Sequence, residues 1–287
     1  MNVGRFRVRH GDRHALTRHD PRQTRYADKE RALAHLQKGV QQLEKFQELL
    51  YAQDRYALLL IFQGMDGAGK DHVIKHVMSG VNPQGTEVHS FKQPSAEELQ
   101  HDYLWRAAKV LPARGRIGIF NRSYYEEVLV VRVHRPVLAA EKVPPEYLGS
   151  TLWQRRFEDI EAFERHLWRN GTVIRKFFLH VSRAEQTRRL RARLDDPTKN
   201  WKFSPTDLAE RRKWSAYRRA YAEMIAATSH RHAPWYVVPA DHKWFAETLV
   251  ADVVVEALEE LKLSFPKLTA DQRTAIAAAR REIGSKR

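Results

Sequence analysis

The feature of this sequence that most constrains its fold is a glycine-rich stretch directly after a short apolar run. The stretch spans residues 64–71, Gly-Met-Asp-Gly-Ala-Gly-Lys-Asp, and has the spacing G-x-x-x-x-G-K. The apolar run at 56–63 is typical of a strand buried on both faces of a parallel sheet, and the apolar residues after the stretch recur with helical spacing. A strand, a glycine-rich turn and a helix in this order are the context that a phosphate-binding loop requires. The stretch therefore predicts a phosphate site in an α/β fold.

The residues of this loop have the properties that phosphate binding needs. Its glycines allow the backbone to curl so that N–H groups point inward, and the start of the following helix adds partial positive charge. Lys70 is placed to reach the phosphate that is transferred. The alternative is a tight strand-to-helix turn that carries a lysine by chance. We expect phosphate contacts from Gly64, Gly67, Ala68, Gly69, Lys70 and Asp71.

Two carboxylates in the loop indicate a metal ion. The position after Lys70 usually carries a serine or threonine hydroxyl that binds Mg²⁺; here it is Asp71, and Asp66 lies inside the loop. A carboxylate in a phosphate cradle repels its ligand unless a cation lies between them, and Mg²⁺ accepts one or two carboxylates together with phosphate oxygens. We therefore expect Asp66 to be the main Mg²⁺ ligand and Asp71 to support it. For Asp71 the alternative is an acidic first-turn residue that the helix dipole favours.

Strand and helix patterns alternate along the rest of the chain. Further strands are predicted at 87–92, 117–121, 172–181 and 235–238. Helices are predicted at 28–53, 95–110, 151–170, 182–194 and 204–227. This alternation is typical of βαβ units, so we expect an α/β fold with a five-stranded parallel sheet flanked by helices. We place one domain at 28–262, between a basic N-terminal arm at 1–27 and a basic C-terminal tail at 263–287.

The strand predicted at 117–121 ends in polar residues that belong to the same site. Ligands collect beyond the carboxyl ends of parallel strands, so Asn121, Arg122 and Ser123 are expected beside the phosphate loop. Arg122 suits phosphate oxygens because its guanidinium donates hydrogen bonds in pairs. Asn121 stands where a metal-binding carboxylate ordinarily ends such a strand, which leaves the metal to the carboxylates of the loop. Glu126 either contacts the metal or the nucleobase, or simply faces water.

Positive charge is abundant and unevenly distributed. The 50 Lys and Arg outnumber the 35 Asp and Glu, for a net charge of +15. This excess favours a polyanionic partner (nucleic acid, an acidic membrane surface or a phosphate polymer), although a solvated basic surface is the alternative. At 188–219 there are eleven basic and four acidic residues. We interpret this segment as a lid that closes over phosphates. The alternative is a pair of amphipathic helices whose basic faces are exposed to solvent. Its expected phosphate-binding residues are Arg193, Lys202, Arg211 and Arg212.

Other classes of protein are excluded by what the sequence lacks. It contains no cysteine, which excludes disulfides, Cys-ligated metals and a thiolate nucleophile. No apolar run reaches the ~18 residues of a membrane span, and the first residues lack the apolar core of a secretory signal. We therefore expect a cytoplasmic protein with no membrane partner.

Several motifs, taken together, resemble those of polyphosphate kinase family 2. Besides the loop at 64–71 they are Gly-Val-Asn-Pro-Gln-Gly at 80–85, Ser-Phe-Lys at 90–92, His-Asp-Tyr-Leu-Trp-Arg at 101–106, Phe-Asn-Arg-Ser-Tyr-Tyr-Glu at 120–126, Trp-Lys-Phe at 201–203 and Ala-Pro-Trp-Tyr at 233–236. The resemblance covers residues 20 to 262 approximately, and the set is far more specific than the phosphate loop alone. The pattern is most similar to the subgroup that accepts both nucleoside mono- and diphosphates.

This resemblance implies a P-loop kinase fold with a helical lid. It also implies Mg²⁺-dependent phosphoryl transfer between inorganic polyphosphate and nucleotides, from AMP to ADP and from ADP to ATP, in either direction. Asp66, Lys70 and Arg122 would then be functional, and the enzyme a homodimer or homotetramer. A polyphosphate chain needs a long cationic groove, which agrees with the charge of the sequence. We expect the nucleotide to be bound by Lys92, Arg106, Asn121 and Glu126.

Two other functions remain as alternatives. One is an ATP-dependent nucleotide kinase of the thymidylate-kinase type, which an assay of the phosphoryl donor separates from a polyphosphate-dependent enzyme. The other is a nucleic-acid-binding P-loop protein. The sequence shows no helix-turn-helix, RNP or OB signature, so we expect no specific nucleic-acid partner.

Overall fold

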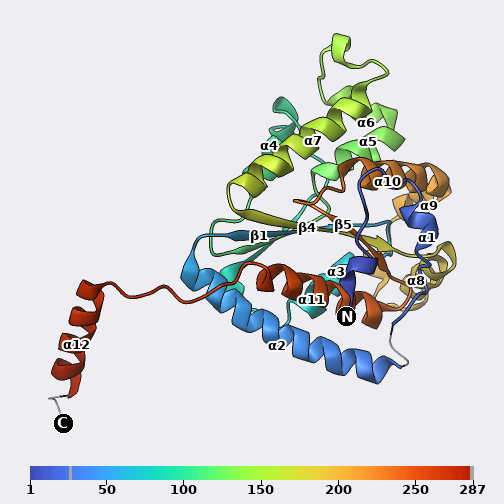
Figure 1. The fold of residues 1–287 in the computed structure, drawn as a ribbon. Coiled ribbons are helices and arrows are strands. Elements are labelled where there is room, and N and C mark those ends of the chain that lie inside the picture. Colours follow the sequence, from blue (N-terminus) through green and yellow to red (C-terminus); the bar gives the residue numbers. More distant parts are fainter. Residues whose placement is uncertain (26–27, 285–287) are drawn as a thin grey trace.

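A parallel sheet forms the centre of the structure, a computed structural model that describes residues 1–25 and 28–284 (Figure 1). Its strands are β1 (Ala57–Gln63), β2 (Thr86–Ser90), β3 (Ile117–Asn121), β4 (Thr172–His180) and β5 (Trp235–Pro239). Their order is β2-β3-β1-β4-β5, and each neighbouring pair is parallel. All residues of β1 are buried, as expected for a central strand covered on both faces. The predicted five-stranded parallel sheet flanked by helices is confirmed.

One face of the sheet is covered by a layer that positions the phosphate loop. The layer consists of α2 (Lys29–Gln53), α3 (Lys70–Val77) and α11 (Lys243–Glu259) (Figure 1). Leu36, Leu43 and Leu50 of α2 lie on one stripe of the helix and are buried in the same cluster as the apolar residues of α11. Because α11 contacts both α2 and α3, this layer fixes the direction of the helix that begins at Lys70.

A second layer covers the opposite face. Its main helices are α5 (Val130–Val133), α7 (Leu152–Arg169) and α10 (Trp214–Thr228) (Figure 1). Phe157 and Ile160 of α7 are buried with Met224 and Ile225 of α10, in a cluster that also holds strand residues. The remaining helices are α1 (Ala15–Arg18), α4 (Trp105–Ala108), α6 (Arg135–Ala140), α8 (Arg183–Asp195), α9 (Pro205–Arg212) and α12 (Ala270–Gly284). Short 3₁₀ turns are η1 (Val3–Arg5), η2 (Pro83–Gly85), η3 (Glu98–Gln100), η4 (Tyr124–Val128), η5 (Pro145–Tyr147) and η6 (Asn200–Lys202).

Beneath the second layer, a lysine of β4 is enclosed by hydrogen-bond acceptors. The Lys176 ammonium donates to Glu164 Oε2 at 2.5 Å, to Tyr125 Oη at 2.8 Å and to the Thr228 carbonyl at 2.7 Å. The hydroxyls of Tyr124 and Tyr125 donate to Glu164 Oε1 at 2.9 and 2.8 Å. The side chains of Lys176 and Glu164 have no exposed surface, so this ion pair joins β4 to α7 in the interior.

The helix predicted at 95–110 is wrong. The expected capping box forms, because Ser95 and Glu98 exchange backbone-to-side-chain hydrogen bonds of 2.7 and 3.2 Å. The helix stops after one turn, since His101 has an extended backbone. Asp102 then accepts a hydrogen bond from the Leu104 N–H at 2.9 Å and begins a separate turn, α4. Local capping chemistry here interrupts the helix that the periodicity predicts.

The prediction of one continuous helix at 204–227 is also wrong, because two helices occupy this segment. Ser204 caps α9 as expected, with its hydroxyl oxygen accepting from the Thr206 N–H at 3.3 Å. The backbone of Lys213 leaves helical geometry, and a second helix, α10, begins at Trp214. α10 buries an apolar face, whereas no residue of α9 is buried. The break lets one helix pack on the sheet while the other remains at the surface.

The two ends of the chain are placed differently. In the segment before α2, Val3, Phe6 and Val8 are buried. This segment runs antiparallel along β5, because the Val8 N–H donates to the Trp235 carbonyl at 2.8 Å and the Val237 N–H donates to the Phe6 carbonyl at 2.9 Å. Every residue of α12 is exposed, and this helix stands apart from the body (Figure 1). Among the described residues, no helix has the length and apolarity needed to cross a membrane.

Candidate active site

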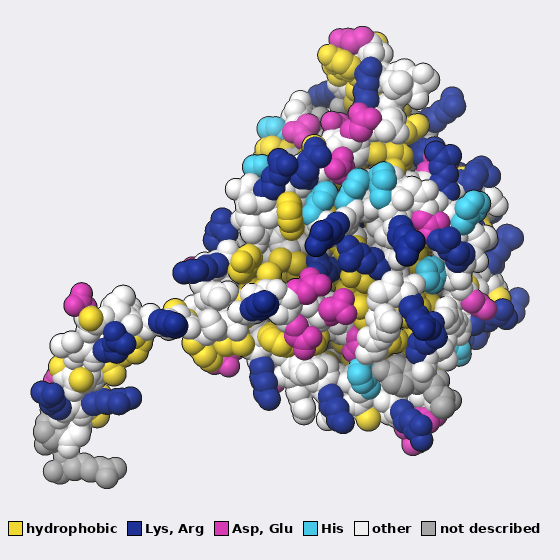
Figure 2. Space-filling view, in the orientation of Figure 1, with side chains coloured by type: hydrophobic (Ala, Val, Ile, Leu, Met, Phe, Trp, Pro, Cys, Tyr) yellow, Lys and Arg dark blue, Asp and Glu magenta, His cyan; other side chains and the backbone are white. Residues whose placement is uncertain are grey.

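A large cleft opens beside the carboxyl ends of β1 and β3. It has a volume of about 1290 Å³, and the phosphate loop, the end of β3 and part of α8 line it. Its basic side chains outnumber its acidic ones by nine to five. The basic residues are Lys70, Lys92, Arg106, Arg122, Arg188, Arg189, Arg193, Lys199 and Lys243. Lys and Arg side chains are also dense on the surface over α8 and α9 (Figure 2).

The backbone of the phosphate loop adopts conformations that favour glycine. Gly69 precedes α3 with φ of 100°, a left-handed conformation that favours glycine. A Cβ on Gly64 would lie 3.0 Å from the Leu179 carbonyl oxygen, so a larger residue does not fit there either. Gly67, Gly69 and Lys70 line the cleft, whereas Gly64 and Ala68 are buried behind it. The Ala68 N–H donates within the loop, to the Met65 carbonyl at 3.0 Å.

Arg189 of α8 supports the loop from behind. Its guanidinium donates to the carbonyl oxygens of Gly67 and Ala68 at 2.9 and 2.8 Å, and to the Asp241 carbonyl at 3.1 Å. Gln186, one turn earlier on α8, donates to the Asp66 carbonyl at 2.7 Å. The first part of the basic segment is therefore tied to the loop and to the chain after β5.

Charged side chains of opposite sign meet at the floor of the cleft. Arg122 Nη2 lies 2.7 Å from Asp66 Oδ1, and Arg122 Nη1 lies 3.4 Å from Glu126 Oε2. Glu126 and Asp66 raise the pKa of Arg122 further above its usual range. Lys70 Nζ donates to the Gly64 carbonyl at 2.8 Å, and burial together with Arg122 lowers the Lys70 pKa to about 8. Arg122 has φ of 63°, an uncommon value for a non-glycine residue and one that recurs at functional sites.

The two residues on either side of Arg122 are held by other parts of the protein. Asn121 Nδ2 donates to Asp71 Oδ1 at 2.5 Å, so the residue that replaces a strand-end carboxylate orients a carboxylate of α3. Ser123 is buried, and its hydroxyl oxygen accepts from Gln63 Nε2 at 3.3 Å and from the Tyr125 N–H at 3.2 Å. Asn121 lines the cleft and Ser123 does not.

Lys92 and Arg106 lie on the β2 side of the cleft. Lys92 is exposed, whereas Arg106 is buried and donates to the Lys92 carbonyl at 2.9 Å. The Arg106 guanidinium stacks over the Phe91 ring at 5.3 Å and lies 3.8 Å from Glu127. The cleft also has an apolar part to its lining, formed by Val130, Val131, Pro136, Val137 and Ala140.

The other basic residues expected to bind phosphate are divided between the cleft and its surroundings. Arg193 lines the cleft and pairs with Asp207 at 3.2 Å. Arg211 donates to Gln186 Oε1 at 2.5 Å and to Thr187 Oγ1 at 2.6 Å, so it joins α9 to α8 and is not a lining residue. Arg212 is exposed outside the cleft. The side chain of Lys202 lies outside the described residues.

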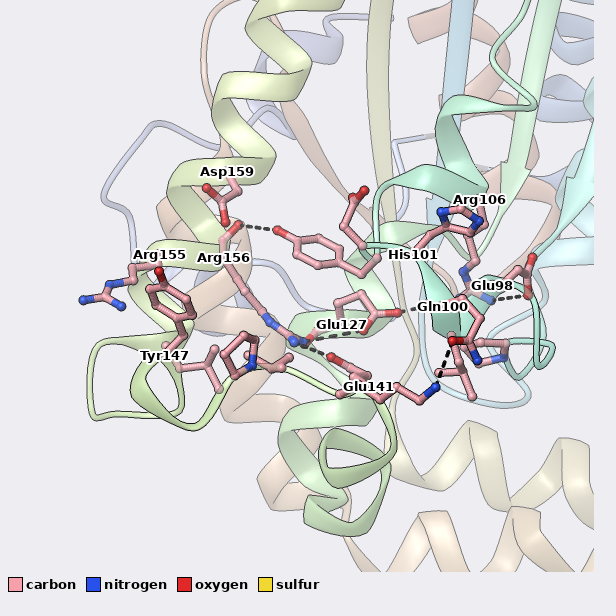
Figure 3. A pocket seen from close by; sticks show the side chains of 18 residues that line it. Glu98, Gln100, His101, Arg106, Glu127, Glu141, Tyr147, Arg155, Arg156 and Asp159 are labelled. Atoms are coloured by element: carbon pink, nitrogen blue, oxygen red, sulfur yellow. Dashed lines mark hydrogen bonds and ion pairs between the residues drawn. The ribbon is translucent and has the colours of Figure 1, made fainter.

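A second cavity lies behind the Arg106 side of the cleft (Figure 3). It has a volume of about 460 Å³ and shares Arg106, Glu127 and Glu141 with the cleft. Arg156 donates to the Glu127 carbonyl at 2.8 Å and to the Glu141 carboxylate. Burial and Glu141 raise the Glu127 pKa to about 8. This charged group forms the wall between the two cavities and holds Arg106.

Comparisons with known proteins identify the family of this chain. The family model of polyphosphate kinase 2 matches residues 26–266. The chain belongs to the polyphosphate kinase 2 family. A relative from Rhodopseudomonas palustris, "ADP-polyphosphate phosphotransferase", is 50% identical over 99% of both chains. Another, from Meiothermus ruber, "AMP/ADP-polyphosphate phosphotransferase", is 44% identical over 92% of this chain and 95% of its own. The crystal structure of polyphosphate kinase 2 from Arthrobacter aurescens superposes with a TM-score of 0.85, at 39% identity over 95% of each chain.

These comparisons confirm the resemblance on which the sequence interpretation relied, and with it the P-loop kinase fold. Kinases of this family typically need a divalent metal, and the floor of the cleft fits one. Asp66 and Asp71 line the cleft and supply carboxylate oxygens, the ligands that hard divalent cations prefer. Asn121 and Arg122 donate hydrogen bonds to Oδ1 of Asp71 and of Asp66, respectively.

Several residues of the cleft were not singled out from the sequence. His72, Arg188, Arg189, Lys199 and Lys243 all line it. Arg188, Arg189 and Lys199 belong to the basic segment, but the sequence does not show which side of a helix faces a cleft that other elements build. For His72 a local signal exists, because a second histidine follows four residues later on the same helix.

Proposed function

We propose that this chain moves phosphoryl groups between inorganic polyphosphate and nucleotides, from AMP to ADP and from ADP to ATP, in either direction. The observation that carries the proposal is the joining of a phosphate loop and nine basic side chains in one cleft. A nucleotide with two or three phosphates needs fewer cations than this. A polymer with about one negative charge per phosphate extends beyond the loop, and the cations of α8, with Lys199 and Lys243, continue in that direction.

The loop side of the cleft suits the transferred phosphoryl group. Phosphoryl transfer asks little covalent chemistry of the protein, so positioning and charge stabilisation dominate catalysis. Lys70 and Arg122 bring two positive charges to the floor, and both exchange an internal partner for a phosphate oxygen when the substrate binds. Arg193 and its neighbours on the rim hold the following phosphates of the polymer.

Asp66 is the proposed main ligand of Mg²⁺, with Asp71 in support. Mg²⁺ held there would supply positive charge that neutralises the phosphates. Asp66 would exchange its ion pair with Arg122 for the metal ion, and Arg122 would then be available to phosphate. Asn121 keeps Asp71 oriented through its hydrogen bond of 2.5 Å.

The acceptor nucleotide is proposed to lie on the β2 side. Lys92 and Arg106 supply charge for its phosphates, and the apolar wall formed by Val130, Val137 and their neighbours covers the base. Glu126 and Asn121 also line the cleft, and they are proposed to contact the acceptor nucleotide. A homodimer or homotetramer in the cytoplasm, where AMP and ADP are available, completes the proposal.

The decisive experiment varies donor, acceptor and metal separately. The purified enzyme is incubated with polyphosphate and either AMP or ADP, with and without Mg²⁺, and the products are separated by chromatography. We expect ADP from AMP and ATP from ADP, only with Mg²⁺. Activity with ATP as donor to a nucleoside monophosphate, and none with polyphosphate, would instead identify a kinase of the thymidylate-kinase type.

A further inference from the structure

Two histidines and a glutamate meet where α3 crosses α11. His72 and His76 stand four residues apart on α3 and therefore share one face of the helix. Glu247 of α11 faces them, with its carboxylate 2.6 Å from His72 Nε2. The three ligand atoms lie within 4.8 Å of one another. Together they form a compact donor set separate from Asp66 and Asp71.

The hydrogen bonds of this cluster prepare it for a metal ion. His76 Nδ1 lies 2.7 Å from the His72 carbonyl oxygen, which places the ring proton there and leaves Nε2 as a ligand. A metal-ligating histidine characteristically donates its other ring N–H to such an acceptor, which fixes the ring. The Glu247 side chain is 4% exposed, so its carboxylate is confined beside the imidazoles.

The residue types select the kind of metal. Two imidazoles at i and i+4 on a helix with a carboxylate from another element form a donor set typical of Zn²⁺. Around a tetrahedral Zn²⁺ such ligand atoms stand about 3.3 Å apart, so small side-chain rotations close this set. Mg²⁺ prefers oxygen ligands and is expected at the loop carboxylates instead.

Nearby positive charges work against a cation at this position. Lys243 precedes Glu247 by one turn of α11, and Lys75 lies between the two histidines in sequence. Together with Arg189, these positive charges disfavour a second positive charge beside His72. These side chains lower the affinity without removing the ligands. His72 also lines the cleft, so water or a phosphate oxygen can approach the cluster from that side.

We propose that His72, His76 and Glu247 form a binding site for a transition-metal ion of the Zn²⁺ type. The ion would tie the helix that follows the phosphate loop to α11. Three protein ligands leave a fourth position to water or to an anion from the cleft. The site is distinct from the proposed Mg²⁺ site, and it does not depend on which nucleotide or phosphoryl donor the enzyme uses.

The test uses the full-length, tag-free enzyme and needs no activity assay. Co²⁺ replaces Zn²⁺ as a spectroscopic probe, with Mg²⁺ in excess to occupy oxygen sites. We expect about one equivalent of Co²⁺ to give the intense visible bands of a four-coordinate ion, and Zn²⁺ to remove them. Zn²⁺ should also raise the Tm of the protein.

Variants separate this site from other possibilities. His76→Ala should lose the visible bands and the Zn²⁺-dependent rise in Tm, and should bind Zn²⁺ at least about tenfold more weakly. Asp66→Asn, which alters the proposed Mg²⁺ site, should retain both signals. His166→Ala, at an exposed position on α7, is the matched histidine control.

The proposal is overturned if Co²⁺ shows only the weak spectrum of a six-coordinate ion in the unaltered enzyme. It is equally overturned if His76→Ala, with unchanged circular dichroism, keeps the bands and the rise in Tm. Where His76→Ala folds poorly, Glu247→Gln is the second variant, because it preserves the shape of the side chain while removing its charge. It should weaken both the Co²⁺ bands and the Zn²⁺-dependent rise in Tm, and unchanged signals would overturn the proposal.

Discussion

Two lysines of this enzyme, one enclosed in the interior and one at the floor of the cleft, have different hydrogen-bond environments. Burial lowers the pKa of both Lys70 and Lys176 to about 8. Lys176 donates to three acceptors and is closed off from solvent, so its three N–H groups are all satisfied. Lys70 donates to the Gly64 carbonyl and borders the cleft. The first arrangement is permanent, whereas the second can exchange a protein oxygen for a phosphate oxygen.

The carboxylates around the two lysines differ in the same way. Glu164 receives hydrogen bonds from Lys176, Tyr124 and Tyr125 and has no exposed surface. Asp66, beside Lys70, pairs with Arg122 and remains 26% exposed. A charge whose partners are all internal adds to stability or specificity of the fold, and one that still faces solvent is available to a ligand. The predictions below test this distinction.

The largest effect on folding is expected from Lys176→Met. This change leaves Glu164 buried without its cation, and we expect the free energy of unfolding to fall by about 3–5 kcal/mol. Urea denaturation followed by circular dichroism measures it. The double variant Lys176→Met/Glu164→Gln removes both charges while keeping acceptors for the tyrosines, and it should recover much of the loss. A change below about 0.5 kcal/mol in the single variant would contradict a structural role.

The corresponding change at the cleft, Lys70→Met, should act on catalysis. We expect kcat for transfer from polyphosphate to ADP to fall by about 10²–10³-fold, because a positive charge directed at the transferred group is lost. The free energy of unfolding should change little. Lys75→Met, at an exposed position on the same helix, is the control. Near-wild-type turnover in Lys70→Met would show that the cleft lysine is as structural as Lys176.

Asp66→Asn tests the exchangeable carboxylate. We expect the Mg²⁺ concentration for half-maximal rate to rise by about tenfold or more, because the main metal ligand loses its charge. Asp71→Asn should have a smaller effect, since Asp71 is already held by Asn121. Rates measured over a Mg²⁺ titration at saturating polyphosphate give both values. Equal shifts in the two variants would mean that the carboxylates share the metal evenly.

The part of this site that follows from the sequence is the part encoded locally. The run at 56–63, the glycine spacing and Lys70 lie within sixteen consecutive residues, and they predicted β1, the loop and α3. Arg122 was found because the carboxyl ends of parallel strands share one edge of the sheet. The capping box at Ser95 also formed, but no local signal revealed the extended backbone of His101 that ends its helix.

The part that did not follow depends on distant partners. Arg189 was one basic residue among eleven in its segment, and its role in holding the loop requires carbonyl oxygens from residues 67, 68, 240 and 241. The wall formed by Arg106, Glu127 and Arg156 likewise joins three separate elements. Charge composition identified the basic segment, whereas the helix packing decides which of its side chains face the cleft.

The smallest effect is expected at the rim, where Arg193→Ala can be compared with Arg212→Ala. Both residues were predicted to bind phosphate, but Arg193 lines the cleft and Arg212 is exposed outside it. A partly exposed charge contributes about 0.5–1 kcal/mol, so Arg193→Ala should raise KM for polyphosphate about two- to fivefold, with KM for ADP unchanged. Arg212→Ala should leave both constants unchanged. The Arg193 effect should shrink as salt increases, because exposed charges are screened. If Arg212→Ala raises KM for polyphosphate as much as Arg193→Ala, then α9 also binds the polymer, and the polyphosphate-binding surface extends beyond the cleft.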